Sequence, residues 1–298
     1  MQMRCQCSMN KVFYKECVLY EEKKDKSVTC NVCSHRCKIQ EEKKGICGVR
    51  KNISGKLYSL VYGLIAASAI DPIEKKPLYH FLPGTSAYSI GTVGCNFRCD
   101  FCQNNELAFS EDVFGDEMLP NQIVENAIYY GCESIAYTYN EPIIFIETIL
   151  DSASLAKQEG ISNILVTNGY ITKEAIDLLK DKIDAMNIDL KSFNDDFYKR
   201  NCGAKLAPVL ECIKNVYNAK IHIEITTLII PGENDSDNEL RDISRFIASI
   251  DKKIPWHISR FSPMHKMLNK SPTPRETLER AYKIGKEEGL NYVHLGNI

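Results

Sequence analysis

From Ser86 onward, short apolar runs that are typical of buried strands alternate with longer stretches in which apolar residues recur about every 3.6 positions. The expected strands are residues 86–93, 134–139, 163–167, 185–190, 222–230, 256–261 and 292–296. The expected helices are residues 120–131, 142–159, 172–180, 207–218, 237–250 and 273–288. Strands that alternate with helices predict parallel pairing through right-handed crossovers. Six successive units fit an α/β barrel or partial barrel better than an open sheet.

The first 84 residues lack this alternation. Ser54-Gly55-Lys56 has the composition of a hairpin turn between two strand-like runs, and Asp71-Pro72 and Pro83-Gly84 are chain breaks. The segment DPIEKKPL, residues 71–78, is expected to be a surface loop. We therefore expect residues 1–84 to form an N-terminal lobe with a connector, and residues 85–298 to form the core domain.

Composition and charge exclude several classes of protein. The 298 residues are 44% hydrophobic, which is enough for a sizeable core, and the net charge of -2 gives no overall basic field for nucleic acid or anionic membrane. No apolar run approaches the ~18 residues of a membrane span. The N-terminal sequence MQMRCQCSMNK lacks the apolar region of a secretory signal. We expect a cytoplasmic protein without a nucleic-acid or membrane partner.

The chain contains 13 cysteines, which is many for a cytoplasmic protein of this size. In a reducing compartment, clustered cysteines bind metal more often than they form disulfides. Seven of them fall in two clusters. The other six are expected to be small buried hydrophobes or free thiols: Cys5, Cys7, Cys17, Cys132, Cys202 and Cys212.

The second cluster, Cys95, Cys99 and Cys102, lies in the sequence GTVGCNFRCDFCQNN directly after the first strand of the core. Three thiolates on one short loop can hold three irons of a cubane cluster. The fourth iron then has no ligand from the loop. An open coordination position is typical of a catalytic metal site rather than a structural one.

The first cluster, Cys30, Cys33, Cys37 and Cys47, supplies four thiolates. Such a set forms either a closed tetrahedral zinc site or a fully ligated iron–sulfur cluster, and the spacing does not separate the two. The alternative is four independent buried thiols. His35 can replace one cysteine as a ligand or lie solvated in the loop. We favour a second metal site.

Polar residues stand where the core strands end, and in a barrel the active site lies at the carboxyl ends of the strands. These residues are Asn140 and Glu141, Thr167 to Gly169, Asp189 and Lys191, and Arg260 and His265. Any one of them alone is consistent with an ordinary loop residue or helix cap. Their shared position predicts a single site beside the three-cysteine loop.

The three-cysteine loop, with Phe101 before its last cysteine, resembles the signature of radical S-adenosylmethionine (SAM) enzymes. TYNEP, TNG, DLK, IIPG and SRFSPMH, in the core, are similar to segments of the pyruvate formate-lyase activating enzymes. The N-terminal CNVCSHRC, GICGVR, LYSLVYG and DPIEKKPLYHF resemble one subgroup, the AmmeMemoRadiSam system radical SAM enzymes. The resemblance covers nearly the whole chain from Cys30.

This resemblance implies a partial (β/α)6 TIM-like barrel of the radical SAM type with a small N-terminal cysteine-containing lobe. It implies a [4Fe-4S] cluster on Cys95, Cys99 and Cys102 whose open iron binds SAM. Reductive cleavage would give methionine and a 5′-deoxyadenosyl radical that abstracts hydrogen from a substrate, as in glycyl radical activation. The implied electron donor is a flavodoxin or ferredoxin.

The resemblance also implies roles in SAM binding for residues of the core. Lys191 would pair with the SAM carboxylate, and Asp189 with the ribose or the amine. The remaining implied SAM contacts are Asn140 and Glu141 to the amino group, Asn168 to the nucleoside, Phe101 to the adenine, and His265 and Arg260 to SAM or substrate.

Two features depart from the family pattern. TYNEP, residues 138–142, replaces a GGEP-like segment, so a contact with the SAM amino group must use other atoms. Relatives continue into a tail with another cysteine pair, whereas this chain ends at Ile298. We therefore expect its C-terminal tail to be truncated relative to the family. Two alternatives stay open: radical modification of a small molecule or another protein, and a non-enzymatic zinc or iron–sulfur protein.

Overall fold

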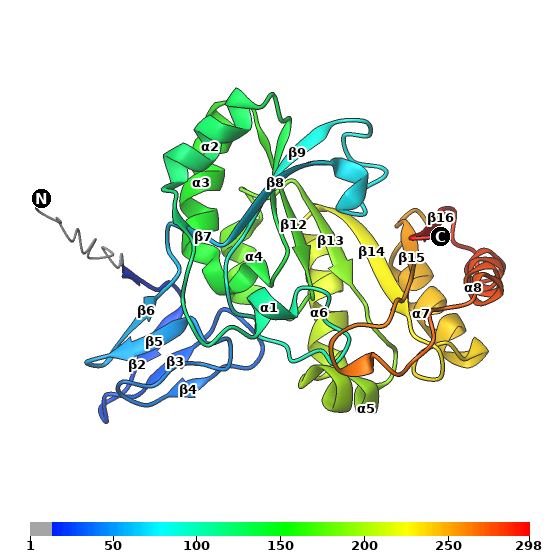
Figure 1. Ribbon diagram of the computed structural model, residues 1–298, viewed down its shortest axis with the longest axis horizontal. Coiled ribbons are helices and arrows are strands. Elements are labelled where there is room, and N and C mark those ends of the chain that lie inside the picture. Colours follow the sequence, from blue (N-terminus) through cyan, green and yellow to red (C-terminus); the bar gives the residue numbers. More distant parts are fainter. Residues whose placement is uncertain (1–13) are drawn as a thin grey trace, which may run out of the picture.

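The computed structural model describes residues 14–298, which are built around one eight-stranded sheet (Figure 1). The strands are β8 (Ala67–Pro72), β9 (Ser86–Gly91), β11 (Ser134–Tyr137), β12 (Ser162–Thr167), β13 (Ala185–Asp189), β14 (His222–Ile229), β15 (Trp256–Arg260) and β16 (Val293–Gly296). Their order in the sheet is β16-β15-β14-β13-β12-β11-β9-β8. Only β8 runs antiparallel to its neighbour, and the other seven strands are parallel. The seven strands expected from the sequence are therefore confirmed.

The expected helices are present as well. They are α2 (Pro120–Tyr129), α3 (Ile146–Gln158), α4 (Lys173–Leu179), α6 (Leu206–Asn218), α7 (Asp237–Ile250) and α8 (Arg275–Glu287). Residues 142–145 form a 3-10 turn that leads into α3, and the short helices α1 (Asn105–Ala108) and α5 (Asp195–Phe197) were not anticipated. Thr172 caps α4 as expected, because its hydroxyl accepts a hydrogen bond from the N–H of Ala175. Over the described residues, no helix combines the length and apolarity that crossing a bilayer requires.

The barrel is open, because among the described strands β8 and β16 do not pair with each other. Part of the segment between β8 and β9, here called the connector (residues 73–85), reaches strands in the middle of the sheet. The side-chain amide of Asn187 on β13 donates to the carbonyl of Pro77, and the N–H of Tyr79 donates to Glu224 on β14. The connector therefore lies across the inner side of the sheet.

The expectation that residues 71–78 form a surface loop is wrong. Ile73 and Leu78 are fully buried, and Lys76 is only 4% exposed, with its ammonium paired to Asp71 at 2.7 Å. The physical reason is that the connector packs its apolar side chains against the sheet and has to neutralise the lysine that it buries.

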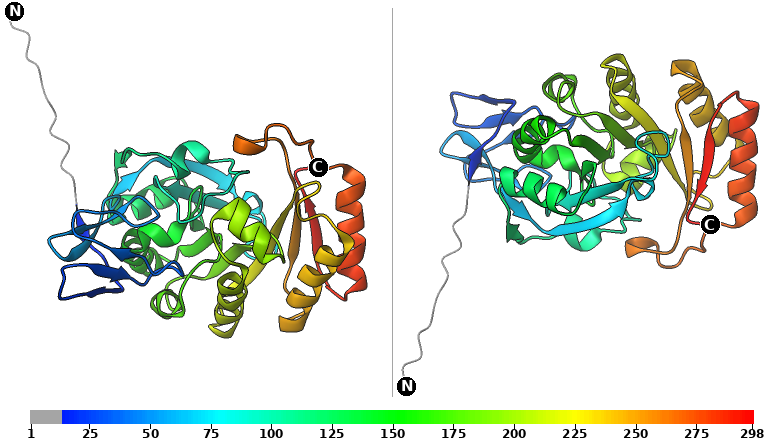
Figure 2. Two further views of the ribbon diagram at one scale, coloured as in Figure 1. Left: turned by 90° about the horizontal axis from the view of Figure 1, so that it is seen from below. Right: turned by 90° about the horizontal axis from the view of Figure 1, so that it is seen from above.

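The N-terminal lobe consists of two small antiparallel sheets. One contains β2 (Tyr20–Glu22), β3 (Val28–Cys30) and β4 (Lys38–Ile39), and the other contains β1 (Lys15–Glu16), β5 (Arg50–Ile53) and β6 (Lys56–Ser59). A third pair joins β7 (Leu64–Ile65) to β10 (Asp116–Glu117). The lobe and α8 lie at opposite ends of the molecule in both views of Figure 2. The predicted hairpin turn at Ser54-Gly55 joins β5 and β6.

The boundary at residue 84 stays a prediction, since β8 precedes it and yet pairs with β9 along its whole length. Four cysteines outside the two clusters are buried, as expected: Cys17, Cys132, Cys202 and Cys212. Cys5 and Cys7 lie outside the described residues.

One buried ion pair fastens the lobe to the core. The guanidinium of Arg50 on β5 binds the carboxylate of Glu147 on α3 through contacts of 2.7 and 3.1 Å, and both side chains are 1% exposed. Arg50 also donates to the carbonyl of Ile144, and Glu147 accepts the N–H of Val18. Because each charge is desolvated, the loss of one partner leaves the other without compensation.

We predict that Arg50→Ala lowers the free energy of unfolding by about 3–5 kcal/mol, the range for breaking a buried pair. The double variant Arg50→Met/Glu147→Leu should recover most of this loss, because it removes both charges. Urea denaturation followed by circular dichroism measures both. The exposed Lys15–Asp151 pair is the control, and Lys15→Ala should cost less than about 1 kcal/mol. An equal cost for the two alanine variants would contradict the role of the buried pair.

Candidate cluster and cofactor site

The three cysteines lie on the loop that follows β9, here called the cysteine loop (residues 92–103), and two close approaches fix its path. At Gly91 a Cβ atom would lie 2.6 Å from the carbonyl oxygen of Thr138, which follows β11. At Gly94, whose φ is +87°, a Cβ atom would lie 2.6 Å from the carbonyl oxygen of Cys47 in the lobe. Only glycine fits at these contacts, so the loop is packed between the core and the lobe.

The side-chain amide of Asn140 holds the start of the cysteine loop. Its oxygen accepts the N–H of Thr92, and its nitrogen donates to the Thr92 hydroxyl and to the carbonyl of Gly94, both at 2.9 Å. The amide of Asn168 reaches the same loop and donates to the side-chain oxygen of Asn96 at 2.8 Å. Both amides therefore position the cysteine loop.

A second support for the loop is a π-helical turn, Tyr198–Cys202. The N–H of Arg98 donates to the carbonyl of Cys202, and the N–H of Asp100 donates to the carbonyl of Asn201. The Cys202 thiol is fully buried beside Cys99, and hydrogen bonding between the two thiols raises the pKa of Cys99. No signal in the sequence predicts this contact, because no spacing rule links Cys202 to the cluster cysteines.

The three cluster thiols open onto one cavity of about 820 Å³. Six of the residues that were expected to contact SAM line this cavity: Phe101, Asn140, Glu141, Asn168, Asp189 and Lys191. His265 and Arg260 are not among the lining residues. The ring of His265 packs against Phe109, and Arg260 donates to the carbonyl of Thr273. The geometry therefore gives no support to a SAM contact by these two residues.

Lys191 and Asp189 form an ion pair of 2.7 Å in the wall of the cavity. Burial alone would lower the pKa of Lys191, but the negative charge of Asp189 raises it well above its usual range. The ammonium also lies 5.8 Å from the ring centroid of Phe101. Lys191 is thus a permanent cation, flanked by an aromatic face and a carboxylate.

Glu141 is 2% exposed, and burial raises its pKa to about 7. One carboxylate oxygen accepts the hydroxyl of Thr167 and the N–H of Ile143, and the other accepts the N–H of Asn168. Both oxygens therefore tie the end of β11 to the end of β12.

The wall of the cavity also includes residues that sequence reasoning missed. Near β8, Asp71 pairs with Lys76 and accepts the hydroxyl of Tyr139. Tyr79 of the connector and His257 on β15 line another part of the wall, with their rings in edge contact. Tyr79 and His257 escaped prediction because they lie in the connector and near the start of β15, away from the carboxyl ends of the strands.

Behind His257, the fully buried Glu224 accepts hydrogen bonds from His257 at 2.6 Å and His222 at 3.0 Å. The N–H groups of Tyr79 and His80 bind the same carboxylate. Burial alone would raise the pKa of Glu224, but these four donors lower it to about 2. Glu224 is thus a fixed negative charge that joins the connector to β14 and β15.

Within residues 14–298, no three histidine, cysteine or acidic side chains surround one point as ligands of a single ion. In a cubane cluster, however, each thiolate binds a different iron, so its ligands need not converge on one atom. Three thiols of one loop that face a single cavity fit that pattern of donors. The residues present therefore fit a [4Fe-4S] cluster with one open iron.

The depressed pKa of Glu224 predicts a pH dependence. Its ionised form contributes stability above the ordinary pKa of 4.5, and this contribution of about 3 kcal/mol is lost as the pH falls toward 2. Glu224→Gln should therefore be less stable at pH 7, and its unfolding free energy should fall less steeply below pH 4.5. Urea denaturation at several pH values measures this. The exposed Glu276→Gln variant should keep the wild-type slope, and identical slopes in all three proteins would refute the assignment.

Comparison with known proteins agrees with this geometry. A model of the radical SAM superfamily matches residues 89–244. An uncharacterized protein of Methanocaldococcus jannaschii is 44% identical over 287 residues, which cover 95% of this chain and 85% of that protein. The pyruvate formate-lyase 1-activating enzyme of Escherichia coli is 25% identical over 215 residues, which cover 66% of this chain and 87% of that enzyme.

The fold is shared with solved structures. A radical SAM methyltransferase from Sphaerobacter thermophilus superposes with a TM-score of 0.58 at 15% identity, over 72% of this chain and 67% of that one. This likeness confirms the α/β partial barrel. Since the family model spans more than half of the residues and includes the cysteine loop, the chain belongs to the radical SAM superfamily.

Proposed function

We propose that this protein is a radical SAM enzyme whose cluster is held by Cys95, Cys99 and Cys102. When bound, the [4Fe-4S] cluster and SAM supply the one-electron cleavage of the sulfonium bond and, through it, hydrogen abstraction from a substrate. The observation that carries this proposal is the opening of three thiols onto the cavity that also contains the Lys191–Asp189 pair. SAM consists of an amino acid joined to a nucleoside. The cation suits the carboxylate of the amino acid, and the neighbouring carboxylate suits the ribose.

Each residue of the wall has a role in this proposal. Lys191 binds the SAM carboxylate, because its charge is permanent, and Asp189 binds the ribose or the amine. Phe101 provides an apolar face for the adenine. Asn140 and Asn168 hold the cysteine loop with their amides, so any contact that they make with SAM adds to this positioning role.

Glu141 contributes to the cofactor site by fixing the ends of β11 and β12. Its carboxylate already accepts three hydrogen bonds, which leaves one acceptor position for the SAM amino group expected from the resemblance. A backbone carbonyl of residues 138–142 can accept that amino group instead.

The substrate occupies the part of the cavity lined by Tyr79 and His257 in this proposal. Similarity to an activating enzyme favours a protein substrate that receives a glycyl radical. The electron donor is a flavodoxin or ferredoxin. Two exposed cations lie on segments that pack against the cysteine loop: Arg200, which pairs with Glu233 at 3.8 Å, and Lys266, which pairs with Asp100 at 3.0 Å. An acidic partner would have to compete with these exposed pairs, which contribute little free energy.

Anaerobic reconstitution with iron and sulfide tests the activity. The reduced protein is expected to convert SAM to methionine and 5′-deoxyadenosine, measured by chromatography. Cys99→Ala should lose this activity together with the cluster absorbance, because one iron loses its ligand. Cys132→Ala, a buried cysteine outside both clusters, should keep both. Product formation by Cys99→Ala at the wild-type rate would refute the proposal.

Lys191→Met tests the carboxylate contact. A charged hydrogen bond contributes about 1.5–3 kcal/mol, so the dissociation constant for SAM should rise by about tenfold to a hundredfold. Isothermal titration of the reconstituted protein measures it. Lys173→Met, at an exposed lysine on α4, should bind SAM like the wild type. If Lys191→Met keeps the cluster and binds SAM with unchanged affinity, the SAM carboxylate does not bind to Lys191.

A further inference from the structure

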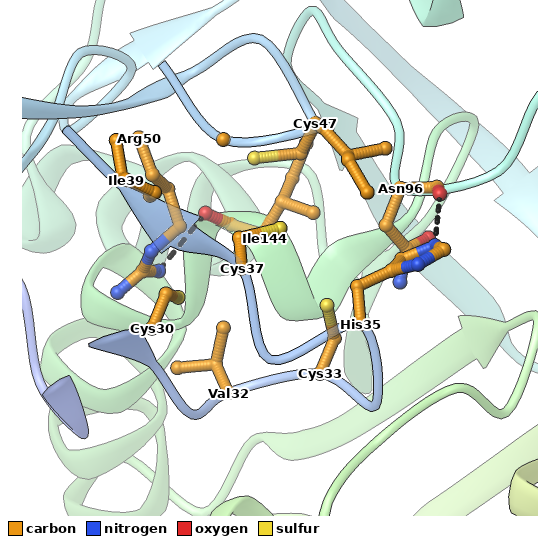
Figure 3. A pocket seen from close by; sticks show the side chains of 12 residues that line it. Cys30, Val32, Cys33, His35, Cys37, Ile39, Cys47, Arg50, Asn96 and Ile144 are labelled. Atoms are coloured by element: carbon orange, nitrogen blue, oxygen red, sulfur yellow. Dashed lines mark hydrogen bonds between the residues drawn. The ribbon is translucent and has the colours of Figure 1, made fainter. Parts of the chain in front are cut away.

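The four cysteines of the lobe, Cys30, Cys33, Cys37 and Cys47, line one small cavity (Figure 3). They come from β3, from the turn after it and from the segment before β5, and none of them forms a disulfide. Three of the four are buried. The other lining side chains are mostly apolar, among them Val32, Ile39, Ile46 and Ile144. Four reduced thiols thus share one apolar compartment.

Two nitrogen donors in the wall of the same cavity have no partner. Among residues 14–298, six buried side-chain nitrogen or oxygen atoms lack a hydrogen bond, and the two nitrogens are Nε of Arg50 and Nδ2 of Asn96. Both residues line the four-cysteine cavity, and each is 1% exposed. A buried donor without an acceptor costs about 1–3 kcal/mol. Metal-bound thiolates or cluster sulfides would supply the missing acceptors.

The lobe also has little of its own to stabilise it. Its described strands are two to four residues long. Sheets this short bury too little apolar surface to be stable alone. In small metal-binding domains, the free energy of binding serves as free energy of folding. A metal held by all four thiolates would link the turns between these short strands.

The four-cysteine segment touches the cysteine loop of the core directly. The ring of His35 hydrogen-bonds the carbonyl of Asn96 at 2.8 Å, and the guanidinium of Arg98 donates to the carbonyl of Ile46. Gly94 packs against the carbonyl of Cys47. Asn96 therefore contributes to both sites: it follows the first cluster cysteine, and its side chain lines the four-cysteine cavity.

We propose that Cys30, Cys33, Cys37 and Cys47 bind a second, thiolate-ligated metal centre that clamps the lobe onto the cysteine loop. Each thiol loses its proton on coordination, and the N–H groups of Arg50 and Asn96 bind the resulting anionic sulfurs. A zinc ion and an iron–sulfur cluster share this ligand chemistry. The thiols do not already surround one point, and the cavity has about 10 Å³ of free space. A zinc ion and a cluster would therefore both require rotation of the thiol side chains.

The test removes the first site so that only the second can load. A full-length variant with Cys95, Cys99 and Cys102 changed to alanine is reconstituted anaerobically, in one arm with zinc and in the other with iron and sulfide, and bound metal is measured by mass spectrometry. We expect about one zinc or about four irons per chain, and the arm that reaches stoichiometry identifies the centre. A folded variant that retains neither metal would overturn the proposal.

Further substitutions locate the metal and test the clamp. When Cys33→Ser and Cys37→Ser are added to this triple variant, metal binding should be abolished. The matched Cys132→Ser/Cys212→Ser pair in the same variant should preserve it. In the otherwise wild-type chain, Cys33→Ser should lower the iron held by the cysteine loop at least twofold, and Cys132→Ser should not. If the Cys33 variants do not fold, the wild type decides: about four irons with one zinc, or about eight irons, support the second centre, and four irons without zinc refute it.

Discussion

The structure depends on one constraint: three thiols have to face a cavity from a single loop whose backbone lies in the interior. Buried N–H and carbonyl groups need partners, and here the partners come from segments that are distant in the sequence. Asn140 binds residues 92 and 94, and the turn that ends at Cys202 pairs with residues 98 and 100. These hydrogen bonds fix the path of the loop's backbone. Such preorganisation suits a centre whose reaction depends on position.

The N-terminal lobe is part of the same support. Its buried Arg50–Glu147 pair fixes β5 against α3, and its carbonyl groups at Ile46 and Cys47 lie against the cysteine loop. The lobe thus closes the side of the loop that the core leaves open. This arrangement connects the proposed second metal centre to the first, because one residue, Asn96, lies beside a cluster cysteine and in the wall of the four-cysteine cavity.

The large cavity has two groups of polar side chains in its wall, which suit the proposed cofactor and the proposed substrate. On one side, Lys191 and Asp189 stand beside the cluster cysteines and an aromatic ring. Elsewhere in the wall, the connector brings Tyr79 next to His257, and the buried Glu224 anchors both. The connector lies across the inner side of the sheet and contributes part of the cavity wall, where partial burial makes electrostatic interactions stronger than in water.

The sequence by itself determined the seven parallel strands, the main helices and the cysteine loop, because these follow from local periodicity and from the spacing of ligands on one short segment. The family followed from the resemblance of the cysteine loop and the other motifs of the core to known radical SAM enzymes. It also placed Asp189, Lys191 and Phe101 at one face, since parallel strands end together. Only the tertiary structure decided how the remaining residues are used. Asn140, Asn168 and Glu141 turned out to hold the loop and the strand ends, and Lys76, Cys202 and Glu224 acquired partners far away in the chain. Such roles depend on which buried groups meet across the fold, and periodicity along the chain carries no information about those encounters.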